Sequence, residues 1–231
     1  MQQLKKFITQ LVTAGLSAGK NLLLPTCCSH CKKILTEQTI FCNQCLYAIR
    51  PIVSTSLSLT RNYAIPVVAI ADYCDPLRSL ILAKHRSDII ASRYLGQLIW
   101  QLTHIKSVPA DYIIPVPLHW TRYAWRGFNQ AEEIAHTLAR KRKIPVIHAV
   151  RRIKKTHFQA RLSAQHRHAN VDNAFVLNTS KPERYYNKHL IIVDDLMTTG
   201  ATLQSLAKIL RILKPASIIA VVACRALTKS S

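Results

Sequence analysis

Glycine and acidic residues are scarce in this chain. Its 231 residues include 5 glycines and 11 Asp or Glu, against 32 Lys or Arg, which gives a formal net charge of +21 at pH 7. The chain carries neither a Walker loop nor a G-x-G-x-x-G turn, which excludes the usual nucleotide-triphosphatase and dinucleotide-binding sites. The charge indicates a surface that attracts polyanions or phosphate-bearing ligands, and a solvated cationic face is the plainer alternative.

Long hydrophobic runs are also missing. Hydrophobic residues make up 49% of the chain, enough for a core, yet no apolar run reaches the length of a membrane span. Residues 1–24 begin with Lys5 and Lys6 and continue in a mildly apolar stretch, but polar residues interrupt that stretch and no small-x-small cleavage site follows. We therefore expect a short amphipathic N-terminal helix rather than a signal peptide, and a cytoplasmic protein.

The most informative stretch is residues 190–202, Leu-Ile-Ile-Val-Asp-Asp-Leu-Met-Thr-Thr-Gly-Ala-Thr. Its four leading apolar residues predict a strand buried on both faces, and the apolar spacing after residue 202 predicts a helix. Between them lie the candidate ligand-binding residues Asp194, Asp195, Thr198, Thr199, Gly200, Ala201 and Thr202. A Thr–Gly turn at a helix N-terminus offers N–H groups to a phosphate, and Gly200 lets the backbone approach it. The carboxylates can accept hydrogen bonds from sugar hydroxyls or bind Mg²⁺, so the unit predicts a site for a phosphorylated sugar.

A second strand-to-helix connection carries cations. Residues 112–116 predict a strand, and Arg122-Tyr-Ala-Trp-Arg-Gly-Phe-Asn-Gln130 leads from it into a helix. Arg122 and Arg126 can give bidentate contacts to phosphate oxygens, and Gly127 suggests a point where backbone approaches a ligand. Lys84 interrupts a helical region over 76–102, either as a pyrophosphate contact or as part of a basic helix surface.

Four cysteines form two CxxC pairs: Cys28, Cys31, Cys42 and Cys45. This spacing predicts a structural Zn²⁺ site, because four thiolates complete a closed tetrahedron with no position left for substrate. Cys27 and His30 are alternative ligands, and a pair of disulfides is the alternative chemistry. Zinc knuckles often have Gly after the second Cys, whereas Lys32 and Leu46 stand there in this chain.

Residues 190–202 resemble the phosphoribosyl pyrophosphate signature of the type I phosphoribosyltransferases. The resemblance implies that Asp194 and Asp195 hold the ribose 2- and 3-hydroxyls, and that loop 198–202 holds the 5-phosphate. Further motifs are similar to the ComF/GntX family over residues 25 to about 225. They are Ile114-Pro-Val-Pro117, Arg126-Gly-Phe-Asn-Gln130, Thr156-x-x-Gln159-x-x-Leu162, Arg167-x-x-Asn170, Ala174-Phe175 and Pro25-x-x-Cys28. That family is tied to DNA uptake in natural competence, and its reaction is not generally assigned.

A basic segment precedes the signature strand, with its cations at Arg151, Arg152, Lys154, Lys155, Arg161 and Arg167. In a type I transferase this segment is a mobile hood, so the resemblance implies that these cations neutralise pyrophosphate as it leaves. A nucleic-acid-binding loop is the alternative, and both could hold, since both ligands are polyanions. Phe158 is the one Phe, Tyr or Trp within 151–167, so we expect electrostatics to dominate contact with single-stranded DNA.

The sequence therefore predicts an α/β protein: a type I phosphoribosyltransferase-like, mainly parallel sheet with helices on both faces, plus a small N-terminal zinc module. The expected divisions are an N-terminal helix over 1–24, the zinc module and linker over 25–60, and the transferase-like domain over 61–231. The expected function is binding of phosphoribosyl pyrophosphate with Mg²⁺ in DNA uptake, with transfer of the phosphoribosyl group left open. The alternative is a non-catalytic, single-stranded DNA-binding adaptor on the same fold. A competence helicase is a further candidate partner.

Overall fold

The structure is a computed structural model that describes residues 27–226 apart from 38, 53–54, 84–88 and 155–173. The chain divides into two compact units, residues 1–48 and 49–231. In the described part of the chain, no helix combines the length and the hydrophobicity needed to cross a membrane. The expected helix over 1–24 lies outside the described residues, as does Lys84.

The first unit is small and contains little secondary structure. An isolated antiparallel bridge joins Cys27 to Ile34, and helix α2 spans Asn43–Tyr47. Its buried apolar side chains include Cys28, Phe41 and Cys45. So few buried side chains leave room for a bound metal to supply much of the unit's stability.

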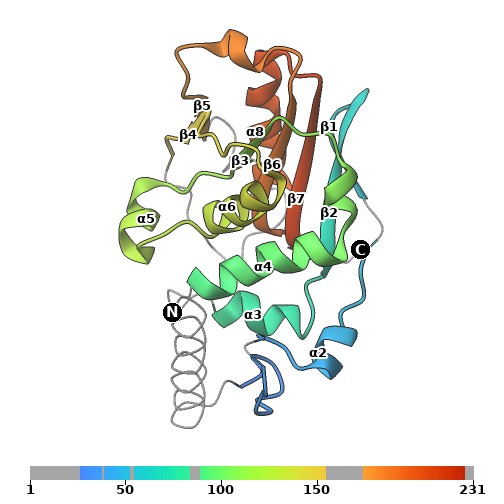
Figure 1. Cartoon of the computed structure of the whole chain (residues 1–231). Helices are drawn as coiled ribbons and strands as arrows, with labels where there is room; N and C mark the ends of the chain where they lie inside the picture. Colours follow the sequence, from blue (N-terminus) through green and yellow to red (C-terminus); the bar gives the residue numbers. More distant parts are fainter. Residues whose placement is uncertain (1–26, 38, 53–54, 84–88, 155–173, 227–231) are drawn as a thin grey trace, which may run out of the picture. The chain divides into compact units, whose positions relative to one another are not determined.

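A five-stranded sheet organises the second unit, in the order β1-β2-β7-β6-β3 (Figure 1). The strands are β1 (Thr55–Thr60), β2 (Tyr63–Asp72), β3 (Tyr112–Pro115), β6 (His189–Met197) and β7 (Ser217–Arg225). Only β1 runs antiparallel to its neighbour, which confirms the predicted mainly parallel sheet. Strand β1 lies within the expected zinc module and linker over 25–60, and it is an edge strand paired with β2. The second unit accordingly begins at Ile49, ahead of the expected domain start at residue 61.

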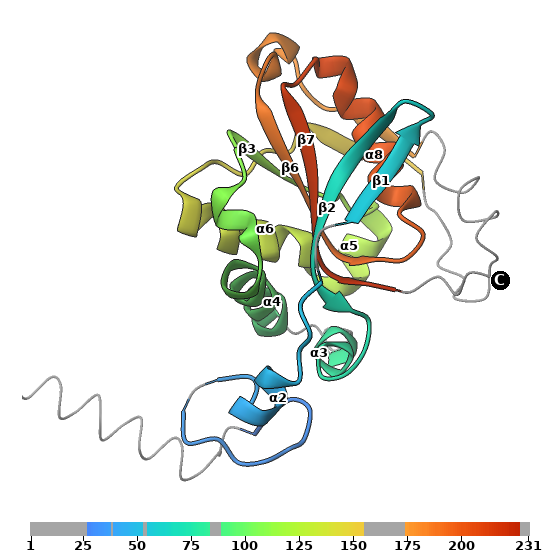
Figure 2. The ribbon, with the colours of Figure 1, turned by 90° about the vertical axis from the view of Figure 1, so that its right-hand side faces the viewer.

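Helices cover both faces of this sheet, as predicted. Helices α4 (Ile89–Leu102) and α6 (Gln130–Arg142) lie on one face, and α8 (Ala201–Leu210) lies on the other (Figure 2). Helix α3 (Leu77–Ala83) precedes α4 in the chain. Successive side chains of a strand point to opposite faces, so the apolar run of β6 serves both layers. Leu190 and Ile192 pack in one buried cluster with Leu203, Leu206 and Leu210 of α8.

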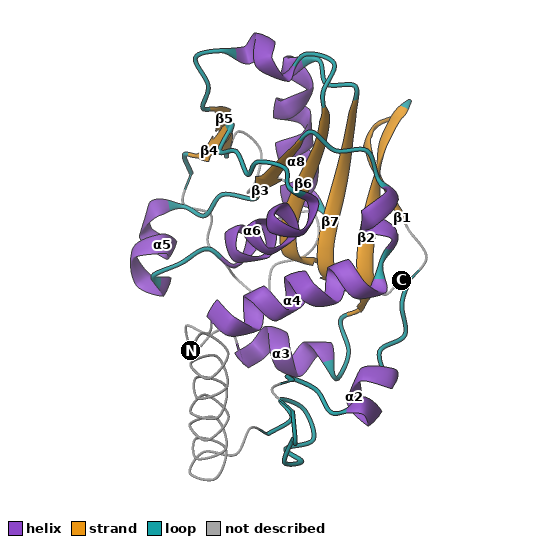
Figure 3. Cartoon of the chain, viewed as in Figure 1, coloured by secondary structure: helices purple, strands orange, loops and turns teal. Residues whose placement is uncertain are grey.

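A separate two-stranded ladder lies outside the main sheet (Figure 3). It pairs β4 (Val150–Arg152) antiparallel with β5 (Phe175–Leu177). Before β4, residues 144–149 form no strand, and a single parallel bridge joins Val146 to Ile113. Pro145 lacks an N–H group, which prevents a longer ladder at that point.

Candidate functional site

The acid pair lies at the carboxyl end of β6. This strand is longer than its apolar run predicts: it continues to Met197, because β7 pairs with it beyond Asp194. On the other side, β3 pairs with β6 only as far as Val193. Asp194 and Asp195 are both half-buried, and the Asp195 N–H donates to Asp194 Oδ1 at 2.8 Å. Ligands of open parallel sheets bind at this end of the strands.

The turn after β6 leads directly into α8. Gly200 is the N-cap of α8 with φ 78°, a left-handed conformation that favours glycine, and Thr199 Oγ1 accepts from the Ala201 N–H at 3.4 Å. A Cβ at Gly200 would lie 2.5 Å from Cδ1 of Leu57, so this glycine also permits close packing against β1. The N-terminal turn of α8 therefore lies close to the acid pair in the chain and in the fold. The first N–H groups of a helix have no partner within the helix, so they can bind an anion there.

The connection after β3 contains a helix, α5 (Trp120–Arg126), where the sequence indicated a loop. Gly127 ends α5 with φ 77°, and its N–H donates to Tyr123 O at 2.8 Å. Asn129 caps α6: its side chain accepts from the Ala131 N–H at 3.1 Å and donates to Val116 O at 3.0 Å. A Cβ at Gly127 would meet nothing within 4 Å. Gly127 and Asn129 thus have capping roles that account for this part of the motif without a ligand.

Arg122, Arg126 and Arg152 form one electrostatic cluster, and Arg152 also interacts with Asp194 of the acid pair. Because β3 and β6 are parallel neighbours, with Pro115 opposite Val193, the connection carrying α5 leaves the sheet next to Asp194. Burial lowers the pKa of Arg122, and burial followed by the charge of Arg122 lowers the pKa of Arg126. The pKa of Arg152 on β4 is also lowered, first by burial and then by the charge of Arg122. The charge of Asp194 partly offsets this lowering. All three guanidinium groups remain charged at neutral pH, so they repel one another at a site that a polyanion would stabilise.

Neighbouring groups hold two of these arginines in place. Arg126 Nη1 donates to Gln130 Oε1 at 3.2 Å, and the Arg152 guanidinium carbon lies 5.4 Å from the centroid of the Phe175 ring. Arg151 and Lys154 are exposed on and just after β4. The remaining expected hood cations, Lys155, Arg161 and Arg167, fall outside the described residues.

A cavity that our sequence analysis did not predict adjoins this cluster. Its volume is about 660 Å³, and its lining residues are Leu118, Trp120, Tyr123, Ala124, Arg151, Arg152 and Ile153. The lining comes from two segments about thirty positions apart, so no local pattern reports it. The aromatic residues on α5 were the available signal, since exposed aromatic side chains often mark binding surfaces.

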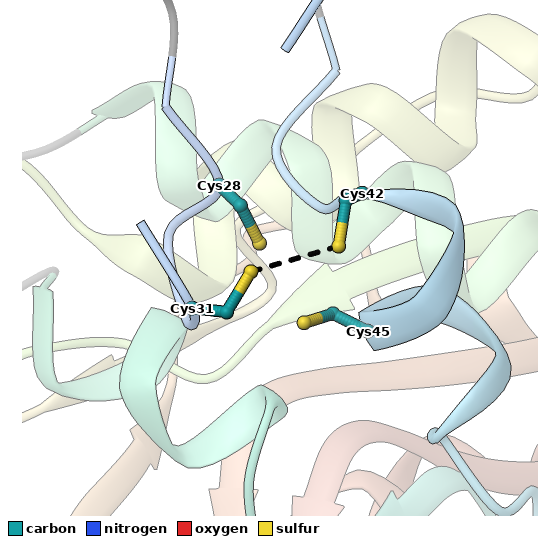
Figure 4. A group of neighbouring side chains, drawn as sticks. All are labelled: Cys28, Cys31, Cys42 and Cys45. Atoms are coloured by element: carbon teal, nitrogen blue, oxygen red, sulfur yellow. Dashed lines mark hydrogen bonds between the residues drawn. The ribbon is translucent and has the colours of Figure 1, made fainter. Parts of the chain in front are cut away.

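The four predicted metal ligands come together in the first unit (Figure 4). The Sγ atoms of Cys28, Cys31, Cys42 and Cys45 all lie within 4.8 Å of one another. Thiolates arranged tetrahedrally at about 2.3 Å from Zn²⁺ have S–S edges of about 3.8 Å, so the cluster could hold such an ion with small adjustments. The group brings in neither Cys27 nor His30, and all seven cysteines are free of disulfides.

Two of these thiols have strongly shifted pKa values. Burial raises the pKa of Cys28, but hydrogen bonds from the backbone of Cys42, Cys31 and His30 outweigh burial and lower it from 9.0 to about 6. Burial, followed by interactions with the neighbouring thiols, raises the pKa of Cys45 to about 12. Backbone N–H groups that donate to a sulfur atom favour its thiolate form, and in metal sites the same hydrogen bonds orient the sulfur ligands.

Comparison with known proteins identifies the family. The family described as "Phosphoribosyl transferase domain" matches residues 124–230. Competence protein F of Haemophilus influenzae is 35% identical over 192 residues, covering 80% of this chain and 78% of that protein. DNA utilization protein YhgH of Shigella flexneri is 34% identical over 201 residues, covering 79% of this chain and 83% of that protein.

Among solved structures, the comparison matches the adenine phosphoribosyltransferase of Thermoanaerobacter pseudethanolicus. That protein is 13% identical, with a TM-score of 0.39 over 80% of this chain and 98% of its own. The sheet order, the helices on both faces and the family match give the second unit a type I phosphoribosyltransferase fold. From the identity to competence protein F over most of both sequences, this chain belongs to the ComF family.

Proposed function

We propose that this protein binds phosphoribosyl pyrophosphate together with Mg²⁺ at the carboxyl end of β6. The observation that carries the proposal is the acid pair, Asp194 and Asp195, next to the N-terminal turn of α8 and within electrostatic reach of the half-buried Arg152. The ribose 2- and 3-hydroxyls donate to the two carboxylates. The 5-phosphate accepts from backbone N–H groups and Thr hydroxyls of residues 198–202.

The three arginines form the pyrophosphate-binding side of this site. Arg122 and Arg126 come from α5 and Arg152 from β4, and each is partly withdrawn from water. A guanidinium group can contact two phosphate oxygens at once, and a bound pyrophosphate would relieve the repulsion among the three cations. The carboxylates of the acid pair are suitable ligands for Mg²⁺, which neutralises pyrophosphate charge when bound.

The same residues suit transfer of the phosphoribosyl group to an acceptor. Pyrophosphate is a good leaving group, so the protein's contribution is to orient the ribose and to stabilise the departing charge. The acid pair does the first and the arginines the second. Release of pyrophosphate on addition of an acceptor would distinguish transfer from binding alone.

We further propose that the site serves the handling of incoming DNA. The relatives are named competence protein F and DNA utilization protein, which supports this role. The second candidate function, a non-catalytic adaptor for single-stranded DNA, is favoured by the net charge of +21, which one bound phosphoribosyl pyrophosphate does not require. Binding of the small ligand and binding of DNA are separable by titration.

Isothermal titration with phosphoribosyl pyrophosphate and Mg²⁺ tests the leading proposal. The double variant Asp194→Asn, Asp195→Asn keeps the shape of both side chains and removes their charge. Each lost charged hydrogen bond costs about 1.5–3 kcal/mol, so we expect affinity to fall beyond detection. Glu133→Gln is the matched control, because Glu133 pairs with Arg93 between α6 and α4. Unchanged affinity in a folded double variant would refute the site.

A further inference from the structure

Helix α5 exposes three large aromatic side chains. Trp120, Tyr123 and Trp125 are 72%, 50% and 76% exposed, and none of the seven residues of α5 is buried. The whole chain has only 3 tryptophans, and two of them are on this helix. Exposed aromatic side chains that contribute nothing to a core indicate a surface that is covered by a ligand or partner.

Two of these rings face a cavity with cationic walls. Trp120 and Tyr123 of α5 line the 660 Å³ cavity together with Arg151 and Arg152 of β4. Residues three apart lie on the same side of a helix, which is why these two rings are presented together. Trp125 is on the same helix but does not line the cavity.

The start of α5 is fixed by its own cap, and Trp120 lies beside the capping residue. The buried His119 is the N-cap: its Nδ1 lies 2.8 Å from Thr121 Oγ1 and accepts from the Thr121 N–H. The centroid of the His119 ring lies 5.8 Å from that of Trp120, with the rings tilted by 38°. A positioned aromatic surface loses little entropy when a planar ligand stacks on it.

We propose that this cavity binds a base of single-stranded DNA, stacked against Trp120 or Tyr123, with Arg151 and Arg152 on the neighbouring phosphates. The inference rests on the DNA-handling role proposed above and adds to it a specific site. Every base has a π-face, so stacking tolerates any sequence, and a guanidinium neutralises backbone phosphate. The volume is in the range of small-ligand pockets and accommodates a nucleotide. An apolar protein partner would instead desolvate Arg151 and Arg152 without supplying an anion of its own.

The stacking site adjoins the proposed phosphoribosyl site. Arg152 lines the cavity and also interacts electrostatically with Arg122 and Asp194. A DNA phosphate at Arg152 would therefore change the charge that pyrophosphate meets, and the two ligands affect each other's affinity by the same factor.

Fluorescence anisotropy of the full chain with labelled oligo-dT, beside an abasic strand of equal length, tests the proposal. The abasic strand keeps the phosphates and lacks the bases. Wild type should prefer the base-bearing strand, and Trp120→Ala with Tyr123→Ala should remove a preference of roughly 5- to 150-fold, the range for stacking of one base. Trp125→Ala, a matched loss of an exposed tryptophan from the same helix, should bind as wild type does.

The outcomes separate the stacking site from the DNA-handling role. Absence of binding to either strand at low salt would overturn the DNA role and the stacking site together. Equal binding of both strands by wild type, or a double variant that keeps the preference, would overturn the stacking site and leave electrostatic DNA binding standing. Tighter binding of oligo-rU than of oligo-dT would overturn the assignment to DNA. Because the substituted rings are exposed, thermal melting should show variants as stable as wild type.

Discussion

The Sγ atoms of Cys31 and Cys42 lie 3.7 Å apart, although the two residues belong to different CxxC pairs (Figure 4). That separation is close to the edge of about 3.8 Å expected for two thiolates on one Zn²⁺ ion. We propose that this ion is zinc. The cluster links two segments of a unit with few buried side chains, so the metal should stabilise the fold of residues 27–48.

Metal analysis should find about one zinc ion for each chain, and Cys42→Ser should lose it. Binding of a structural metal contributes to the folding free energy of the unit that holds it. Removal of the metal by a chelator should therefore loosen the first unit and leave the second folded. Cys27→Ser is the matched control, because Cys27 is exposed and outside the cluster, and it should retain the metal. A metal-free wild type with an intact first unit would contradict the assignment.

Lys32→Gly should stabilise the first unit. Lys32 has φ 64°, and the left-handed conformation costs a residue with a Cβ roughly 1–2 kcal/mol. The variant loses a hydrogen bond from Lys32 Nζ to Ser29 O at 3.0 Å, but that bond is exposed and contributes less. Competition with a chelator measures the change as tighter retention of zinc. Lys33→Gly is the control, since Lys33 is not among the residues with positive φ, and equal effects at both positions would argue against backbone strain.

Gly200→Ala and Gly127→Ala form a matched pair. The two φ angles are 78° and 77°, so the left-handed strain of roughly 1–2 kcal/mol should be common to both variants. At Gly200 the new Cβ would also meet Leu57 at 2.5 Å, whereas at Gly127 it meets nothing within 4 Å. Denaturant unfolding should therefore show a larger loss for Gly200→Ala. Equal losses would mean that Leu57 moves aside without cost.

Arg122→Gln should weaken the binding of phosphoribosyl pyrophosphate without destabilising the free protein. The substitution removes a cation whose charge lowers the pKa values of Arg126 and Arg152, so it relieves repulsion when no ligand is bound. Loss of a charged hydrogen bond to the ligand should cost about 1.5–3 kcal/mol of binding. Thermal melting and titration measure the two effects. Arg93→Gln, which breaks an ion pair between α4 and α6, should leave ligand affinity unchanged.

Binding of single-stranded DNA should fall steeply with salt. The logarithm of affinity should change with a slope of about −0.7 for each phosphate neutralised, and Arg151→Gln with Lys154→Gln should make that slope shallower. Saturating phosphoribosyl pyrophosphate with Mg²⁺ should weaken DNA binding, because Arg152 serves both sites. Titrations at two salt concentrations, with and without the small ligand, measure both effects. DNA binding that is independent of salt, or that ignores the small ligand, would contradict the shared cationic surface.

Local patterns in the sequence determined the main elements of this protein. Residues 190–193 predict a strand buried on both faces because β6 lies inside a parallel sheet, and the leucines of α8 repeat with helical spacing because one side of that helix is buried. The CxxC spacing predicted the four-cysteine cluster because each pair presents two thiols from one turn. In each case the chemistry is set by residues close together in the chain.

Only the tertiary structure decided which distant residues meet. The pairing of β7 carries β6 through Asp194 and Asp195, although the apolar run stops at Val193. A strand's end is fixed by its partner's hydrogen bonds, and its own side chains do not report them. Gly127 likewise is the C-cap of α5, a helix in a connection that the sequence indicated as a loop.

The arrangement of the cations and aromatic rings depends on sheet order in the same way. Within the basic segment over 151–167 the sequence offers only Phe158 for stacking, so we expected electrostatics to dominate contact with DNA. In the structure, Trp120 and Tyr123 line one cavity together with Arg151, and Arg152 is within electrostatic range of Asp194. These contacts join residues about thirty to forty positions apart through the packing of α5 and β4 beside the β3–β6 pair. Periodicity and spacing describe one segment at a time, so they carry no information about such contacts.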